Sequence, residues 1–153
     1  MITHPVLNNL TIVTLKQFVR GLFLDLRRER ETAKTWVDNY RIKTPTLDTP
    51  VSSMSGGNQQ KIVISKWVAM NPKIFLLNDP TKGIDVGAKV EIYKDIEKLC
   101  EGGCGVLYVA AELPELLGIA DRVYVLHEGK MVGEFEGDEI TQKNIVASAI
   151  GEE

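Results

Sequence analysis

Apolar side chains recur at helical spacing in the first part of the chain. Between residues 7 and 20 they return at steps of three and four. Between residues 27 and 40 they form one stripe, with arginine and glutamate between its members: Ala33, Trp36, Val37 and Tyr40. Both stretches are therefore predicted to be amphipathic helices. Residues 43–50 hold two prolines and three threonines, which predicts a loop.

Apolar runs and helical periods then alternate through the middle of the chain. Residues 57–70 are apolar on nearly every side of a helical wheel, so this helix is expected to be buried. Two short apolar runs, 73–77 and 105–109, predict buried strands, and the period of residues 86–100 predicts a helix between them. A strand, a helix and a second strand in this order indicate a partly parallel α/β sheet.

The C-terminal third is predicted to hold a short helix, a hairpin and a last helix. Residues 113–119 form the first helix. Apolar stretches at 123–126 and 131–135 flank a four-residue segment, a pattern that predicts a β-hairpin with a four-residue loop. Thr141 is the expected N-cap of a final helix over 141–150.

Composition and charge narrow the class of protein. The chain has 153 residues, 44% hydrophobic and 25% charged, which fits one globular domain and excludes a disordered protein. The net charge of −3 argues against a general nucleic-acid binder, so no nucleic-acid partner is expected. The chain contains no run of 18 apolar residues, so no transmembrane helix is expected. The first residues do not resemble a secretory signal. Cys100 and Cys104 fit neither a redox nor a zinc motif, so we expect two reduced thiols.

The segment Ser55-Gly56-Gly57 is the first candidate for chemistry. Ser55 directly precedes a predicted helix, where a serine caps the helix while its hydroxyl can also meet a ligand. The two glycines let backbone amides approach an anion, and the helix N-terminus adds partial positive charge. A plain serine-capped helix after a glycine turn explains the same residues equally well, and these residues alone do not decide between the two interpretations.

Polar residues also follow the first predicted strand. Asn78 and Asp79 stand at its C-terminal end, where α/β folds place ligands, although Asn-Asp-Pro is also good turn chemistry. The stretch Gly83-Ile84-Asp85-Val86-Gly87-Ala88-Lys89 looks like a phosphate loop but lacks its spacing, because only three residues separate the glycines and Ala88 precedes the lysine. No other stretch of the 153 residues supplies a phosphate loop either.

Taken in order, these motifs resemble the ATPases of ABC transporters. Ser-Gly-Gly-Asn-Gln-Gln-Lys, Asn-Asp-Pro-Thr, Gly-Ile-Asp-Val-Gly-Ala-Lys and Ala-Ala-Glu most resemble the second, C-terminal nucleotide-binding domain of the tandem ATPases of ribose-, galactose- and xylose-type importers. The resemblance covers essentially the whole chain. It implies an α/β fold, a truncated P-loop NTPase domain with a partly parallel sheet, a helical subdomain and a C-terminal hairpin. We expect residues 1–56 to form the helical subdomain, and residues 57–153 a partial ATPase core that lacks the phosphate-loop segment.

The resemblance implies an ATP site shared between two domains. Ser55, Gly56 and Gly57 correspond to the signature that touches the γ-phosphate of a nucleotide held by a partner, with Gln59 nearby. Asp85 corresponds to the aspartate of a loop that crosses the domain interface. The implied cofactors are ATP and magnesium. The implied partners are a second nucleotide-binding domain or subunit and a membrane permease, at the cytoplasmic face of the cell membrane.

Three further positions correspond to catalytic residues but depart from the family pattern. Asn78 stands where the family has an aspartate that helps to hold magnesium, and Asp79 stands where it has the glutamate that polarises the attacking water. Ala111 stands at the position of the switch histidine, and it can neither bond a phosphate nor carry a proton. Because the phosphate loop is missing as well, we expect no ATP hydrolysis by this chain alone.

Two classes of function remain open. In the first, the chain is a fragment or split half of a sugar-importer ATPase and completes the ATP site of another domain. In the second, it is an interaction or regulatory module that docks on a permease or an intact ATPase without nucleotide. A degenerate product with no role is a weaker third reading. The arginine-rich helices before residue 41 fit a permease-facing surface and a solvated surface equally well. Exposed strand edges also predict self-association.

Overall fold

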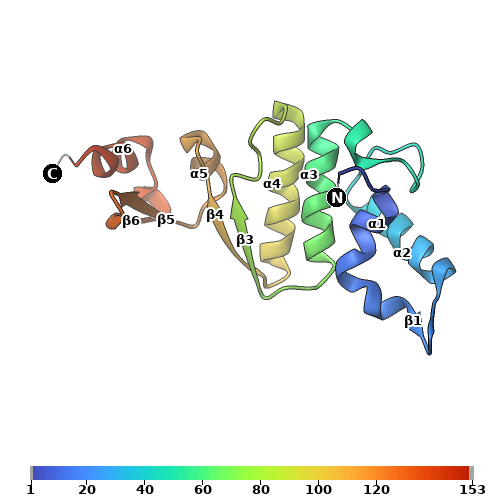
Figure 1. The fold of residues 1–153 in the computed structure, drawn as a ribbon. Coiled ribbons are helices and arrows are strands. Elements are labelled where there is room, and N and C mark those ends of the chain that lie inside the picture. The colour runs from blue at the N-terminus through green and yellow to red at the C-terminus, as the bar shows by residue number, and fades with distance from the viewer. Residues whose placement is uncertain (1, 152–153) are drawn as a thin grey trace. The chain divides into compact units, whose positions relative to one another are not determined.

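The computed structural model describes residues 2–151, and its contacts divide the chain into two compact units, residues 1–107 and residues 108–153 (Figure 1). Each unit is described by itself. The first unit contains the helices α1 to α4 and the strands β1 to β3, and β4 runs across its last residues. The second unit contains α5, β5, β6 and α6.

The first unit begins with a helical layer. Helix α1 (Val6–Thr11) continues as a 3-10 helix (Ile12–Phe18), and α2 (Leu26–Asn39) follows a hairpin formed by β1 (Val19–Arg20) and β2 (Phe23–Leu24). The layer packs around a core that reaches α3: Val6, Leu7, Leu10, Ala33, Ile42, Leu47, Val51 and Ile62. Amphipathic helices are confirmed in both predicted stretches.

The predicted end of the first helix is wrong. The chain leaves the helix at Phe18 and enters the β1–β2 hairpin, in which Val19 pairs with Leu24 and Arg20 with Phe23. Gly21 turns the hairpin with a φ of +61°, a conformation that glycine adopts without a side-chain clash. The helical periodicity of apolar residues continues past Phe18 in the sequence because the hairpin also carries apolar side chains. These side chains, Val19 among them, are exposed in the structure.

The middle of the chain forms the predicted strand–helix–strand unit. After a short 3-10 helix (Val51–Ser53) come α3 (Gly56–Val68), β3 (Ile74–Asn78), α4 (Val86–Glu101) and β4 (Gly105–Val109). Strands β3 and β4 form a two-stranded sheet. The N–H of Gly105, at the start of β4, donates to the carbonyl of Lys73, just before β3, at 2.9 Å. Both strands therefore start at the same edge, and the predicted parallel pairing is confirmed.

The expected full burial of this sheet and of α3 is wrong. Phe75 and Leu77 are buried, but Ile74 and Leu76 on the opposite face of β3 are 70% and 69% exposed. Val63 and Trp67 of α3 are also exposed. Within the described residues β3 pairs with β4 alone, and the exposure of Ile74 and Leu76 shows that this face of β3 is uncovered. Apolar content alone does not reveal that only one face of an element is covered.

The second unit is a hairpin with two helices. Its elements are α5 (Leu113–Ile119), β5 (Arg122–His127), β6 (Lys130–Glu136) and α6 (Gln142–Ile150), with a 3-10 turn at Gly137–Glu139. The antiparallel hairpin is confirmed, but its loop has two residues, Glu128 and Gly129, rather than four. Both have positive φ, 47° and 77°, as tight hairpin turns require. The hydroxyl of Thr141 accepts from the N–H of Asn144 at 3.2 Å, so the predicted cap is confirmed.

None of the helices described here combines the length and the apolar character needed to cross a bilayer. This agrees with the absence of a long apolar run in the sequence.

A carboxylate is buried where the helical layer meets α4. Asp95 is buried on α4, and the guanidinium of Arg41 approaches its carboxylate to 3.5 Å. Burial raises the pKa of Asp95, although the positive charge of Arg41 opposes this shift. Burial also raises the pKa of the neighbouring Tyr40 hydroxyl. The ionised form of Asp95 is therefore less favourable in the folded protein than in the unfolded chain.

We expect Asp95→Asn to stabilise the fold at pH 7 but not at pH 3. The raised pKa means that Asp95 binds its proton more tightly in the folded state, so its contribution is present at low pH. That contribution is lost as the pH rises from about 4 through the folded pKa. Asparagine removes this loss, and Arg41 is half exposed and stays hydrated. Urea unfolding between pH 3 and pH 7 measures the effect, with exposed Glu97→Gln as control. A variant less stable than the wild type at pH 7 would contradict it.

Candidate functional site

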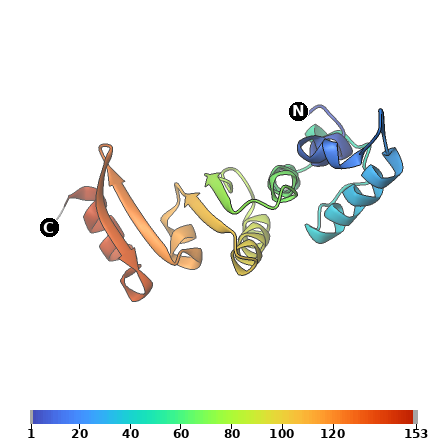
Figure 2. The same cartoon turned by 90° about the horizontal axis from the view of Figure 1, so that it is seen from below.

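Helices α3 and α4 begin side by side (Figures 1 and 2). A Cβ atom on Gly57 would lie 2.6 Å from the Cβ of Ala88 and 3.8 Å from a carboxylate oxygen of Asp85, so the first turns are in close contact. One turn further on, Lys61 of α3 meets Glu91 of α4, which shows that the two helices run in the same direction. The structure therefore brings together the predicted signature segment, Ser55–Gly57, and Asp85.

Ser55 stands at the N-cap of α3 but does not cap it. Its side chain makes no capping bond, and its hydroxyl instead accepts from the Asn58 side-chain amide at 2.9 Å. The Asn58 carbonyl oxygen accepts from the backbone N–H of Lys43 at 2.8 Å. The predicted serine cap is therefore wrong. The first-turn N–H groups of α3 have no side-chain cap, and such groups together with the positive helix end attract anions.

Gln59 and Asn58 hold the loop that leads into α3. The Gln59 side-chain amide donates to the carbonyl of Met54 at 2.9 Å, so the side chain folds back onto the preceding loop. Asn58 links Ser55 to the segment that follows α2. Sequence reasoning did not single out Asn58. An asparagine three residues after a predicted N-cap serine was the available signal, since such side chains bond locally.

Asp85 caps α4. Its carboxylate accepts from the N–H of Ala88 at 2.9 Å, and it lies beside buried Gly57. A carboxylate is favourable at a helix N-terminus because it faces the positive end of the helix dipole. The N-terminal ends of α3 and α4 thus form one packed edge of the first unit.

Asn78 and Asp79 lie at the carboxyl end of β3, as expected. Asn78 is exposed and ends the strand, and Asp79 follows with a φ of +50°. The carbonyl of Asp79 accepts from the N–H of Lys82 at 3.2 Å, which closes the turn. Ala111 lies in the second unit, in the bend between β4 and α5.

The residues at the end of β3 do not fit a resident magnesium ion. Magnesium prefers carboxylate ligands, and of the two residues here only Asp79 carries one. Among the residues that the structure describes, no group of three histidine, cysteine or acidic side chains is placed to hold a metal. The first turn of α3 fits a phosphate group better, because its N–H groups have no side-chain cap and the exposed Gly56 leaves space beside them.

A helix that starts at Ser-Gly-Gly, a β-strand that ends in Asn-Asp-Pro and an aspartate-capped helix beside it define an ATP-binding-cassette type of protein. The sequence model of the ABC transporter family matches residues 3–82, and the chain belongs to this family. The resemblance deduced from the motifs is confirmed.

Relatives of this chain are ATP-binding proteins of sugar importers. The xylose import ATP-binding protein XylG of Geobacillus kaustophilus is 44% identical over 95% of this chain. The ribose import ATP-binding protein RbsA of the same organism is 45% identical over 94% of it. The L-arabinose transport ATP-binding protein AraG of Geobacillus stearothermophilus is 40% identical over 95%. The chain spans 28–29% of the length of these relatives.

Solved ATP-binding cassettes share the fold. The ADP conformation of MJ1267 superimposes with a TM-score of 0.74 at 21% identity, over 97% of this chain and 63% of that one. The dimeric, post-hydrolysis cassette MJ0796 bound to ADP and phosphate gives 0.73 at 23% identity, over 89% and 58%. The α/β, truncated P-loop NTPase fold predicted from the sequence is confirmed. The division into a helical subdomain at 1–56 and a partial core at 57–153 stays a prediction.

Proposed function

We propose that this chain supplies the signature side of a shared ATP site in the ATP-binding protein of a sugar importer. Ser55, Gly56 and Gly57 face the γ-phosphate of a nucleotide that the phosphate loop of a second nucleotide-binding domain or subunit holds. The observation that carries the proposal is the uncapped first turn of α3, packed at Gly57 against the helix that Asp85 caps. The names of the relatives support the sugar-import context.

On this proposal the chain alone does not hydrolyse ATP. Its 153 residues contain no phosphate loop, so little in them can cradle a triphosphate. Asn78 is neutral and cannot balance the charge of magnesium. The Asp79 carboxylate is one methylene group shorter than glutamate, and a misplacement of about 1 Å can lower a rate on the order of 100-fold. Ala111 has no group that transfers a proton.

The uncovered apolar face of the first unit supports the proposal that a further polypeptide packs on it. A groove of about 490 Å³ runs between α3 and β3. Its lining is mostly apolar and includes Val63, Trp67, Ile74 and Leu76, with Gln60 and Asn78 among its few polar residues. Solved cassettes extend well beyond the part that this chain covers. We propose that another part of a cassette covers this face, that a membrane permease is the further partner at the inner membrane face, and that the isolated chain self-associates through its exposed strands.

The test is nucleotide-dependent association with an intact relative. The purified chain, labelled with a fluorophore, is titrated with the ribose import ATP-binding protein RbsA of Geobacillus kaustophilus, with and without magnesium and a slowly hydrolysed ATP analogue. We expect tighter association with nucleotide. Ser55→Arg should weaken it at least about tenfold, because the long side chain fills the space in front of the first turn of α3 and keeps the phosphate away. Ser52→Arg, on the exposed 3-10 turn just before, is the matched control.

Two results would overturn the proposal. Association that ignores nucleotide and is unchanged by Ser55→Arg would favour the nucleotide-independent interaction module. Turnover of ATP by the purified chain alone would show that the 153 residues build a complete site.

A further inference from the structure

We propose that Lys61 and Glu91 form a positioning pair that holds the phosphate-facing end of α3 in register with the start of α4. The inference rests on the proposed function, because it explains how the signature segment is kept beside Asp85. Neither residue touches the nucleotide in this proposal. Both act through the helices that carry Gly57 and Asp85.

The contacts of Lys61 are directional. Its side chain is 5% exposed, and its ammonium group donates to the Glu91 carboxylate and, at 3.2 Å, to the carbonyl of Arg41. Lys61 is five residues from the first residue of α3, and Glu91 is five residues from the first residue of α4. A shift of one helix by a single residue, about 1.5 Å along its axis, would pull the two charges out of register.

The ends of the two helices need such a restraint. Both N-termini carry partial positive charge at the same edge, and the Asp85 carboxylate beside them offsets part of their repulsion. The close contact of Gly57 with Ala88 is apolar, and apolar contacts are not directional. The pair one turn later provides a fixed register. Lys61 lies one turn after Gly57 in the same helix, so the register that Lys61 sets also fixes the positions of Ser55 and Gly56.

Arg41 extends the restraint to the helical layer. Its backbone has a φ of +49°, which turns the chain after α2, and its carbonyl accepts from Lys61. Its guanidinium approaches Asp95 of α4 to 3.5 Å. Arg41 therefore links the turn after α2 to α3, through its carbonyl and Lys61, and to α4, through its guanidinium and Asp95.

The pair contributes more to position than to stability. Glu91 is 38% exposed, so it stays hydrated if Lys61 loses its charge. Lys61→Met keeps the length of the buried side chain, and the Glu91 carboxylate that it leaves unpaired is partly solvated, so the loss is smaller than when a fully buried charge loses its partner. The lowered pKa of Glu91, caused first by its hydrogen bond from Lys61, gives a direct reporter of the pair.

The experiment compares Lys61→Met with Lys61→Arg and with Lys94→Met, which removes an exposed lysine from α4. Amide hydrogen exchange reports on the helix ends at Gln59, whose N–H donates to the Ser55 carbonyl at 2.9 Å, and at Ala88 and Lys89, whose N–H groups donate to Asp85. A carboxyl NMR titration reports the pKa of Glu91. In Lys61→Met we expect about tenfold faster exchange at these amides, a Glu91 pKa that rises towards its ordinary value, and about tenfold weaker nucleotide-dependent association with RbsA. Lys61→Arg should restore all three readouts, and Lys94→Met should change none.

The outcomes separate this inference from the proposed function. If Lys61→Met changes neither the exchange at Gln59 nor the association, the positioning pair is wrong. If the wild-type chain shows no nucleotide-dependent association, the proposed function fails, while hydrogen exchange still decides whether Lys61 positions the helix ends. If Lys61→Met unfolds the chain, Glu91→Ala, which removes the acceptor from the helix α4 side, replaces it in the same comparison. Unchanged exchange in Glu91→Ala would then overturn the inference.

Discussion

Replacing Gly57 with alanine will force the starts of α3 and α4 apart. The new methyl carbon would lie 2.6 Å from the Cβ of Ala88, well inside contact distance, and 3.4 Å from a methyl of Ile84. We expect a loss of roughly 1–3 kcal/mol in the free energy of unfolding, as for other overpacked sites. Nucleotide-dependent association with RbsA should fall on the order of 100-fold, since the anion-facing turn is displaced. Urea unfolding and the binding titration measure the two effects.

Three matched variants test the cause. Ala88→Gly combined with Gly57→Ala should recover stability, because it removes the methyl group that clashes. Gly56→Ala should leave stability nearly unchanged, since its methyl would meet only the Gly83 carbonyl at 3.8 Å, yet still weaken association. Gly118→Ala on α5, where nothing lies within 4 Å, reports the helix-propensity gain alone, up to about 1 kcal/mol. If the double variant stays as unstable as Gly57→Ala, the clash is not the cause.

Phe18→Ala should produce the largest loss of stability among the side chains of the helical layer. Phe18 is 2% exposed at the base of the β1–β2 hairpin, and its carbonyl accepts from the N–H of Asp25 at 2.8 Å. Removing its ring leaves a cavity, which typically lowers the free energy of unfolding by about 3–5 kcal/mol. The signal of the first unit in urea unfolding, followed by Trp36 and Trp67 fluorescence, measures the loss.

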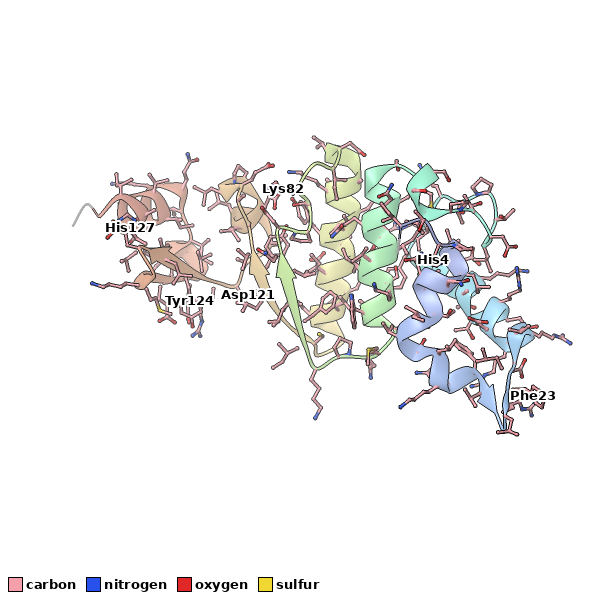
Figure 3. All side chains as sticks on the ribbon, in the orientation of Figure 1. His4, Phe23, Lys82, Asp121, Tyr124 and His127 are labelled. Carbon is pink, nitrogen blue, oxygen red and sulfur yellow. The ribbon has the colours of Figure 1, made fainter. Side chains whose placement is uncertain are left out.

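Phe23→Ala is the matched control. Figure 3 shows Phe23 at the outer end of the same hairpin, where it is 79% exposed. Its removal should change stability by no more than about 0.5 kcal/mol. Equal losses in the two variants would mean that the hairpin tip is covered in solution, for example by a second copy of the chain.

The sequence was most informative where chemistry and local spacing coincide. Ser55, Gly56 and Gly57 were predicted as a signature segment and Asp85 as a residue of an interface loop, and the structure places the two helix starts in contact. The parallel pair of strands and the cap at Thr141 were also predictable, since each depends on a short, regular pattern. The roles assigned to these residues stay predictions.

The sequence was less informative where geometry depends on distant partners. The bond between Ser55 and Asn58 could not be separated from an ordinary serine cap, because both use the same residues. The ion pair of Lys61 with Glu91 joins residues 30 positions apart, so no local pattern announces it. The exposure of Ile74 and Leu76 depends on which elements pack on that face of β3. The apolar periodicity of the sequence identifies these residues but not the elements that would cover them.

The uncovered face of β3 and α3 also sets how the chain responds to temperature and denaturant. Side chains such as Leu76 and Trp67 are already in water in the folded state, so unfolding exposes less new apolar surface than in an ordinary domain of this size. Both the heat-capacity change of unfolding and the denaturant slope scale with that surface. The folded chain should therefore have a flat stability curve and a broad denaturant transition. A polypeptide that covers this face would make the stability curve more strongly curved and the denaturant transition steeper. The midpoint of unfolding would then depend on the concentration of that polypeptide.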